Sequence, residues 1–145
     1  MRLVPDIGLP SHVHVPGSGS APDLVPLEHA KDLTPAVTKA QDWQDNVPYL
    51  YGHDLMRDGY YWEAHEVWEA VWLATPANSP ERLLLQALIQ NANARLKSGM
   101  QRENAAARLH IQVEELRIDL VARLGGQIDT YMGVGIGRKN MHYNA

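Results

Sequence analysis

The sequence predicts an all-α, single-domain bundle of about five helices, with an irregular N-terminal arm and a short irregular C-terminal tail. Apolar side chains recur every three or four residues through the middle of the chain, which is the period of a helix buried on one side. Ser, Pro and Gly stand at the expected beginnings and ends of these periodic segments. No segment shows the alternation that predicts a strand, and no internal repeat is visible.

The composition is typical of one globular domain. The chain has 145 residues, of which 45% are hydrophobic and 21% charged, and its net charge is −4. No basic block is present, so we expect no nucleic-acid partner. The absence of cysteine excludes disulfides and thiolate zinc sites. The first residues lack a signal-peptide pattern, and no stretch approaches the roughly 18 apolar residues of a membrane span, so we expect a cytoplasmic protein with no membrane partner.

Residues 1–33 are expected to form the irregular arm. Proline at high density denies regular hydrogen bonding, and the run Gly17-Ser18-Gly19-Ser20 raises the entropy cost of ordering. The arm is expected to wrap on the domain or on a neighbouring subunit. In the second case the protein would be a homo-oligomer. His12 and His14 form a lone His-x-His, which in such a segment favours solvated over metal-bound histidines. The prolines are Pro5, Pro10, Pro16, Pro22 and Pro26.

Residues 34–125 are expected to form the helical domain. Thr34 and Pro35 predict a first helix running to about Asp45. Pro48 predicts a second, which stops at Asp58-Gly59 and contains His53, interpreted as a surface or packed residue and not as a ligand.

The later helices have clear boundaries. Ser79, Pro80 and Glu81 are a strong start signal for a helix that runs to about Ser98 and ends at Gly99. A last helix is expected over about 102–124, ended by a glycine pair. Residues 126–145 are interpreted as an irregular tail, because their Gly-x-Gly-x-Gly lacks the strand and helix of a phosphate loop.

The segment Tyr60–Trp72 is predicted to be the central helix. It contains three of the four tryptophans and ends near Ala74, because Pro76 disfavours helix at the residue before it. One face is expected in the core and consists of Tyr60, Tyr61, Ala64, Val67, Trp68 and Val71. The other face carries Trp62, Glu63, His65, Glu66 and Glu69.

Three interpretations of this polar face stay open. It is a solvated acidic face, a partly buried polar network without chemistry, or a metal or acid–base site. His65 and Glu69 are four residues apart, so both could reach one cation, as the two ligands on a zincin helix do. The zincin pattern is incomplete because Glu69 replaces its second histidine, and Trp62 stands where the Glu-x-x-His pair of di-iron bundles needs a carboxylate.

The following helix is apolar around most of its circumference, and its long polar side chains form one narrow row. This row either meets something polar or is the exposed edge of the helix. Gln86 and Gln90 are suited to bridging carboxylates because an amide both donates and accepts hydrogen bonds. The row consists of Arg82, Gln86, Gln90, Asn93 and Lys97.

The run from Gly59 to Glu69, followed by Trp72, resembles domain-of-unknown-function family 309 (DUF309). A second block, Glu81-Arg82, Leu85 to Gln90 and Ala92, carries the same resemblance, which covers about residues 47–120. It implies a small all-helical domain, and similar proteins are often labelled as predicted metal-dependent hydrolases. One departure is Arg95-Leu96-Lys97, where relatives often carry histidine. That departure removes a nitrogen ligand and places a cation nearby.

The first functional hypothesis is a metal-assisted hydrolase. His65 and Glu69, with Glu63, would hold a divalent ion, and Glu66 would act as general base on the bound water. Carboxylates with one imidazole favour manganese or magnesium, or zinc at a weaker site.

Two alternatives stay open. In a non-catalytic binding or scaffold module, Trp62, Trp72 and Tyr61 would form a groove in which the glutamates attract a basic peptide or a small molecule such as an amine. In a purely structural network, the acids would pair with Arg82 and Lys97 and accept bonds from Gln86 and Gln90.

Overall fold

Five α-helices and one 3-10 helix build the domain in the computed structural model, which describes residues 1–144. The all-α prediction is therefore confirmed, and none of the described helices is long and apolar enough to cross a membrane. The helices are α1 (Val25–Asp32), η1 (Ala40–Asp45), α2 (Val47–Arg57), α3 (Tyr61–Leu73), α4 (Pro80–Gly99) and α5 (Glu103–Arg123).

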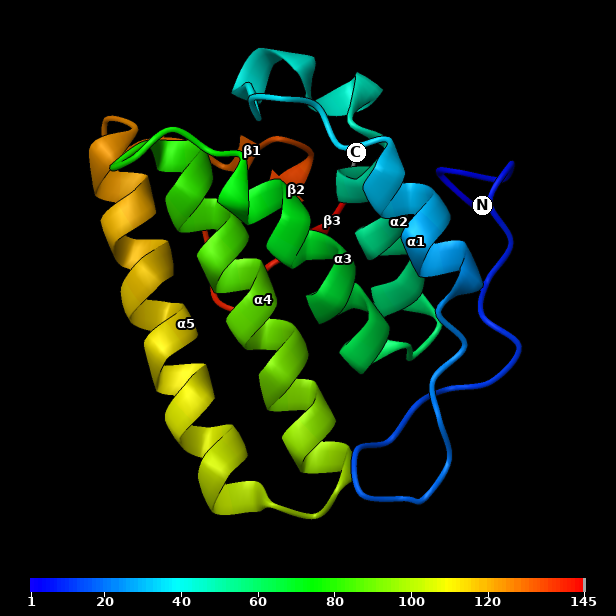
Figure 1. The fold of residues 1–145 in the computed structure, drawn as a ribbon. Coiled ribbons are helices and arrows are strands. Elements are labelled where there is room, and N and C mark those ends of the chain that lie inside the picture. Colours follow the sequence, from blue (N-terminus) through cyan, green and yellow to red (C-terminus); the bar gives the residue numbers. More distant parts are fainter. Residues whose placement is uncertain (145) are drawn as a thin grey trace.

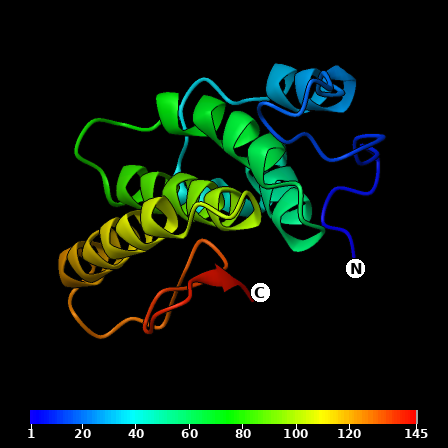
Figure 2. The ribbon, with the colours of Figure 1, turned by 90° about the horizontal axis from the view of Figure 1, so that it is seen from below.

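The helices pack in chain order. α2 packs on α3, α3 on α4, and α4 on α5, while α1 lies over α3 and α2 (Figure 1). The two long helices α4 and α5 run side by side as an antiparallel pair, which Figure 2 shows from below. This arrangement places α3, with its predicted site residues, between α1 and α2 on one side and α4 on the other.

Local capping chemistry sets the beginnings of α2 and α4. The Asn46 side chain accepts a hydrogen bond from the Tyr49 backbone N–H at 3.2 Å, and Ser79 Oγ accepts one from Arg82 N–H at 3.2 Å. Each cap is followed by a proline in the first turn. A helix N-terminus leaves backbone N–H groups unpaired. The capping side chain accepts a hydrogen bond from one of them, and proline has no N–H group to pair. The predicted start at Ser79 is therefore confirmed.

Trp68 is the centre of the core. Its ring is buried, and its indole N–H donates to the Tyr49 carbonyl at 3.0 Å. The predicted core residues Ala64, Val67 and Val71 of α3 are buried with it, whereas Tyr60 and Tyr61 at the beginning of the helix are partly exposed.

The N-terminal arm is more ordered than the sequence predicts. Its last part forms α1, with Pro26 in the first turn and with Leu27 and Ala30 buried. Its first part is fixed to α2 through Asp54, whose carboxylate accepts hydrogen bonds from the backbone N–H of Leu3 at 2.7 Å and of Val4 at 2.9 Å. Hydrogen bonds donated to a carboxylate thus replace regular backbone bonds in this proline-containing segment.

The helix predicted over 34–45 is only partly formed, since η1 begins at Ala40. Thr38 explains the difference. Its side chain is buried and donates from Oγ1 to the Val71 carbonyl at 2.8 Å, and its backbone N–H donates to the Ala74 carbonyl at 2.9 Å. These bonds to the end of α3 hold the segment before η1 out of a helix.

The tail also differs from the prediction, because it contains a small antiparallel sheet. The strands are β1 (Thr130–Tyr131), β2 (Val134–Gly135) and β3 (His142–Tyr143), in the order β1-β2-β3. Strands of two residues are too short to show an alternating pattern. Tyr49 Oη donates to the Met132 carbonyl at 2.6 Å, and Arg117 of α5 donates to the Ile136 carbonyl at 2.9 Å, so the tail is held to α2 and α5.

Candidate functional site

The predicted site residues of α3 lie in separate environments. Glu63 is completely buried under the N-terminal arm, whereas His65, Glu66 and Glu69 lie toward the surface. The structure therefore brings three of the four together and separates the fourth.

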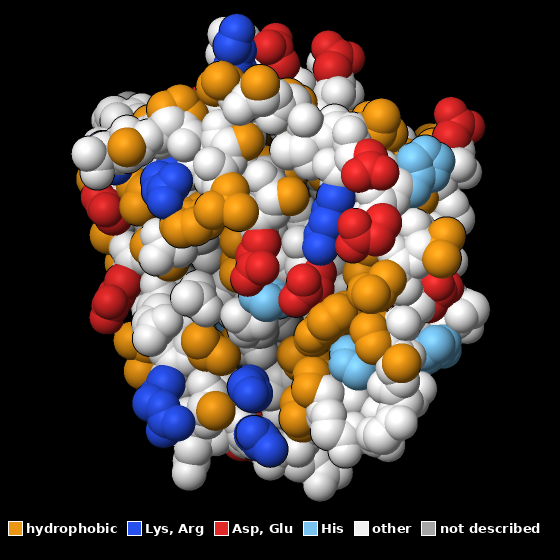
Figure 3. All heavy atoms as spheres, in the orientation of Figure 1, with side chains coloured by type: hydrophobic (Ala, Val, Ile, Leu, Met, Phe, Trp, Pro, Cys, Tyr) orange, Lys and Arg blue, Asp and Glu red, His pale blue; other side chains and the backbone are white. Residues whose placement is uncertain are grey.

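His65 lies between the two glutamates. Its Nε2 is 2.8 Å from Glu69 Oε1, and its Nδ1 is 3.7 Å from Glu66 Oε1. Glu66 is also 3.7 Å from Lys31 Nζ of α1. Figure 3 shows acidic side chains gathered around a histidine near the middle of this face. These partners supply a charge network across α1 and α3, in which Glu69 remains half exposed.

Glu63 is held by the arm. Its Oε2 accepts a hydrogen bond from the His14 backbone N–H at 2.8 Å, and its Oε1 has no hydrogen-bond partner among residues 1–144. Burial raises the pKa of Glu63 above its ordinary value, against the smaller opposing effect of the bond from His14. The neighbouring Trp62 packs edge-on against the His14 ring with centroids 4.7 Å apart.

Trp72 and Arg82 form a third environment, at the other end of α3. The Arg82 guanidinium lies 3.9 Å from the Trp72 ring centroid, in cation–π geometry. Arg82 Nη1 also donates to Thr75 Oγ1 at 3.2 Å. Of the tryptophans predicted to form a groove, Trp62 thus contacts His14 and Trp72 contacts Arg82, and the groove itself stays a prediction.

The predicted bridges between α3 and the polar row of α4 do not form. Gln86 is exposed and Gln90 half-buried. The ion pairs of the described chain join Glu66 to Lys31 and His65, and Glu69 to His65, and none joins an α3 acid to Arg82 or Lys97. Over residues 1–144, no three His, Cys, Asp or Glu side chains are grouped so as to hold a metal ion. The metal site stays a prediction.

We expect Glu63→Gln to leave the melting temperature at neutral pH unchanged or to raise it. Because burial raises the native pKa, the native state holds the proton more tightly than the unfolded state. Stability is then lost as pH rises from the unfolded pKa through the native one. Glu63→Gln should not lose stability as pH rises. Urea unfolding across the pH range measures the free energy of unfolding of wild type and variant, with the exposed Glu115→Gln as control. A strongly destabilised variant at neutral pH would show instead that an ionised Glu63 supports the fold.

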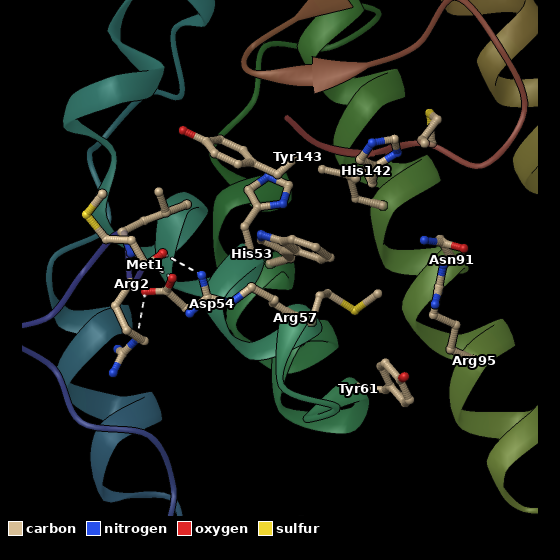
Figure 4. Close-up of a pocket in the computed structure, with 15 residues that line it drawn as sticks. Met1, Arg2, His53, Asp54, Arg57, Tyr61, Asn91, Arg95, His142 and Tyr143 are labelled. Atoms are coloured by element: carbon tan, nitrogen blue, oxygen red, sulfur yellow. Dashed lines mark hydrogen bonds and ion pairs between the residues drawn. The ribbon is translucent and has the colours of Figure 1, made fainter. Parts of the chain in front are cut away.

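A cavity of about 610 Å³ lies on the other side of α3, between α2, α3, α4 and the two chain ends. Figure 4 shows its polar side chains: His53 and Arg57 of α2, Tyr61 of α3, and Asn91 and Arg95 of α4. Residues 1–3 and 141–143 complete its wall. Its volume is that of a small-molecule site.

His53 is the buried polar group of this cavity. Its ring contacts the aromatic rings of Tyr49, Trp68 and Tyr143, with centroids 4.8, 5.0 and 4.9 Å away. The side chain is 7% exposed, and its Nε2 has no hydrogen-bond partner within the described chain. Burial lowers the pKa of His53 to about 3, so the imidazole is neutral at physiological pH. Of the two interpretations of His53, as a surface or as a packed residue, the structure shows the packed one, and its unpaired nitrogen has no signal in the sequence.

One face of α4 supplies the opposite wall. Leu88, Asn91 and Arg95 are spaced by three and four residues, so they share one side of the helix. Asn91 is 9% exposed, which is unusual for an amide on the apolar side of a helix. That amide was the available sequence signal, and it points to the cavity face and not to the row of Gln86 and Gln90.

Asp54 is the only carboxylate of the cavity wall among residues 1–144, and it is fully engaged. It pairs with Arg2 Nε at 3.1 Å in addition to its two backbone donors, Leu3 and Val4. Arg57 donates to the Met1 carbonyl, which joins the arm to the end of α2. The charges left at the mouth of the cavity are therefore those of arginines.

The contribution of His53 to the free energy of unfolding is expected to depend on pH. Its pKa is lowered in the native state, so that stability is complete above the unfolded value of 6.5 and is lost as pH falls toward 3. The loss relative to His53→Gln approaches ~1.4 kcal/mol per pH unit. Urea unfolding at several pH values measures it, with the exposed His110→Gln as control. If the free energy of unfolding had the same pH dependence in wild type and His53→Gln, a buried neutral imidazole would be contradicted.

Fold and site together define a small all-α domain with a ligand-sized cavity between three of its helices. Residues 49–109 match the model of the family described as domain of unknown function (DUF309), so this segment of the chain is similar to that family. No curated protein and no solved structure matches the chain. The family segment contains the cavity residues of α2, α3 and α4, whereas the flanking residues 1–3 and 141–143 lie outside it.

Proposed function

We propose that this domain is a binding module that holds a small organic molecule in the cavity between α2, α3 and α4. The observation that carries the proposal is the unpaired, buried Nε2 of His53 in the wall of a cavity of about 610 Å³. A buried polar atom without a partner costs free energy, about 1–3 kcal/mol, so natural proteins keep few of them without a use.

Asn91 supports the same proposal from the facing helix. Its side chain is mostly buried and lines the cavity. A neutral imidazole and an amide both combine donor and acceptor capacity. Few polar groups on a mainly apolar wall are the usual composition of a small-molecule site.

Nuclear magnetic resonance of tag-free protein with ¹³C-labelled histidines tests this proposal. A library of planar aromatic and heteroaromatic fragments is added, and the ring signals are followed. We expect some fragments to shift the signals of His53 and His142, which line the cavity, and to leave those of the exposed His29 and His110 unchanged. The wild-type spectrum gives this answer even where a His53 variant does not fold.

His53→Gln supplies the matching variant, with His110→Gln as control. The first should weaken every fragment that shifts the His53 signal, and the second should weaken none. Fragments that perturb only remote histidines, or a library that perturbs none, would overturn the proposed binding function.

Metal-assisted hydrolysis is the second candidate, favoured by the 2.8 Å contact between His65 Nε2 and Glu69 Oε1 with Glu66 beside it. Two carboxylates and one imidazole would favour a hard divalent ion. Elemental analysis of tag-free protein loaded with manganese, magnesium or zinc tests it. A stoichiometric ion that is lost in His65→Ala and Glu69→Ala would support the candidate, and protein without a retained ion would remove it.

A further inference from the structure

The cavity is unbalanced in charge. Three arginines, Arg2, Arg57 and Arg95, line it, and Asp54 is the only acidic residue that does. Asp54 and Arg2 neutralise each other at 3.1 Å, which leaves Arg57 and Arg95. Because His53 is neutral, the remaining field at the mouth is positive.

The two remaining arginines differ in their partners. Arg57 lies 3.9 Å from Asp58 and also donates to the Met1 carbonyl. Arg95 takes part in none of the ion pairs of the described chain. Both side chains are exposed, so their charged groups stay hydrated at the cavity mouth until an anion replaces the water.

The interior of the cavity is suited to a flat apolar body. His53, Trp68 and Tyr143 present aromatic rings, and Leu88, Met56 and Met141 present aliphatic and thioether groups. Aromatic rings prefer offset or edge-on contact with another ring, and methionine adapts to its shape. Figure 4 shows His53 and Tyr143 on one side of this space and Asn91 and Arg95 on the other.

We infer that the ligand of this cavity is an organic anion with a planar, mainly apolar body, whose carboxylate or phosphate group is bound by Arg95 with Arg57 beside it. This inference rests on the proposed binding function and adds the chemical class of the ligand. Asn91, one turn before Arg95 on the same face of α4, supplies a neutral hydrogen-bond donor in the same wall of the cavity. The planar body packs on the ring of His53.

Isothermal titration calorimetry with four related probes tests the inference: 2-naphthoate, 2-naphthamide, 2-naphthamidine and 2-naphthyl phosphate. The first three share one shape and carry negative, zero and positive charge. We expect the carboxylate to bind at least about tenfold more tightly than the amide, and the amidine to bind most weakly. The preference should shrink as salt is added. The phosphate shows whether a phosphoryl group or a carboxylate is the better anion.

Arg95→Gln should reduce the preference for naphthoate over naphthamide to less than about threefold, because the carboxylate loses more affinity than the amide. Arg95→Lys should retain part of the preference, and Arg108→Gln, an exposed arginine of α5 outside the cavity, should change nothing. Because the side chain of Arg95 is exposed, these variants are expected to fold.

The outcomes separate this inference from the proposed function. Equal affinities for the carboxylate and the amide, both lowered in His53→Gln, would overturn the anionic ligand and leave the binding function standing. A preference for the anion that survives in the Arg57→Gln/Arg95→Gln double variant would also overturn it, since the anion would then bind elsewhere. Absence of binding by all four probes overturns the inference. The binding function itself is tested separately, by the nuclear magnetic resonance experiment with fragments.

Discussion

Gly52→Ala is expected to lower the free energy of unfolding by ~3 kcal/mol, because overpacking of a filled core displaces its neighbours. A Cβ at position 52 would lie within the indole of Trp68, 2.6 Å from Cδ1 and closer still to Nε1. Trp68 is buried and hydrogen-bonded to the Tyr49 carbonyl of α2 at 3.0 Å, so it cannot move away without losing that bond. The close approach of α2 and α3 thus requires glycine at this position.

Urea unfolding of Gly52→Ala measures this effect, and Gly99→Ala is the matched control. Gly99 is the last residue of α4 and has open space around it, so alanine there should be neutral or slightly stabilising. Trp68→Phe should recover part of the stability in the Gly52→Ala background, since it removes the indole nitrogen. Equal stabilities of the two alanine variants would show that α2 and α3 do not depend on this contact.

Asp54→Ala is expected to lower the free energy of unfolding by ~3 kcal/mol, as loss of one partner of a buried charge network does. The carboxylate is 1% exposed and holds the backbone N–H groups of Leu3 and Val4 together with Arg2. Without it, Leu3 and Val4 lose their hydrogen bonds to α2, and the bond from Arg57 to the Met1 carbonyl remains. The wall of the cavity formed by residues 1–3 is then weakened, and the affinity for a bound ligand should fall with it.

Hydrogen exchange distinguishes this local effect from general unfolding. The amides of Leu3 and Val4 should exchange rapidly in Asp54→Ala, while those in α4 and α5 remain protected under native conditions. Asp58→Ala, a nearby aspartate with a partly exposed side chain, is the control and should leave the arm protected. Slow exchange of Leu3 and Val4 in Asp54→Ala would contradict the role given to this carboxylate.

Much of the fold follows from local chemistry. Ser79 and Pro80 determine where α4 begins, and the period of Ala64, Val67 and Val71 determines which side of α3 is buried. The density of prolines in residues 1–33 predicts no helix there, yet Pro26 lies in the first turn of α1, where proline is favoured. The start of η1 was misplaced because Thr38 bonds to the end of α3, a contact over 33 residues that no local pattern contains.

The candidate site was less predictable. Glu63 and Glu66 are three residues apart on one helix, yet only Glu63 is buried, because the arm around His14 covers it. The cavity joins residues 1–3, α2, α4 and residues 141–143, which are far apart in the sequence. Spacing within one helix cannot indicate such a site, whereas Asn91 on an apolar helix face gives a partial signal.

A crystal structure of the protein with 2-naphthoate bound tests the binding of an organic anion in this cavity most directly. We predict electron density for the carboxylate within hydrogen-bond distance of the Arg95 guanidinium, and for the naphthalene ring against the imidazole of His53. Density for the compound at the surface of α3 or α5, with the cavity beside His53 unchanged, would contradict both the proposed function and the class of ligand inferred for it.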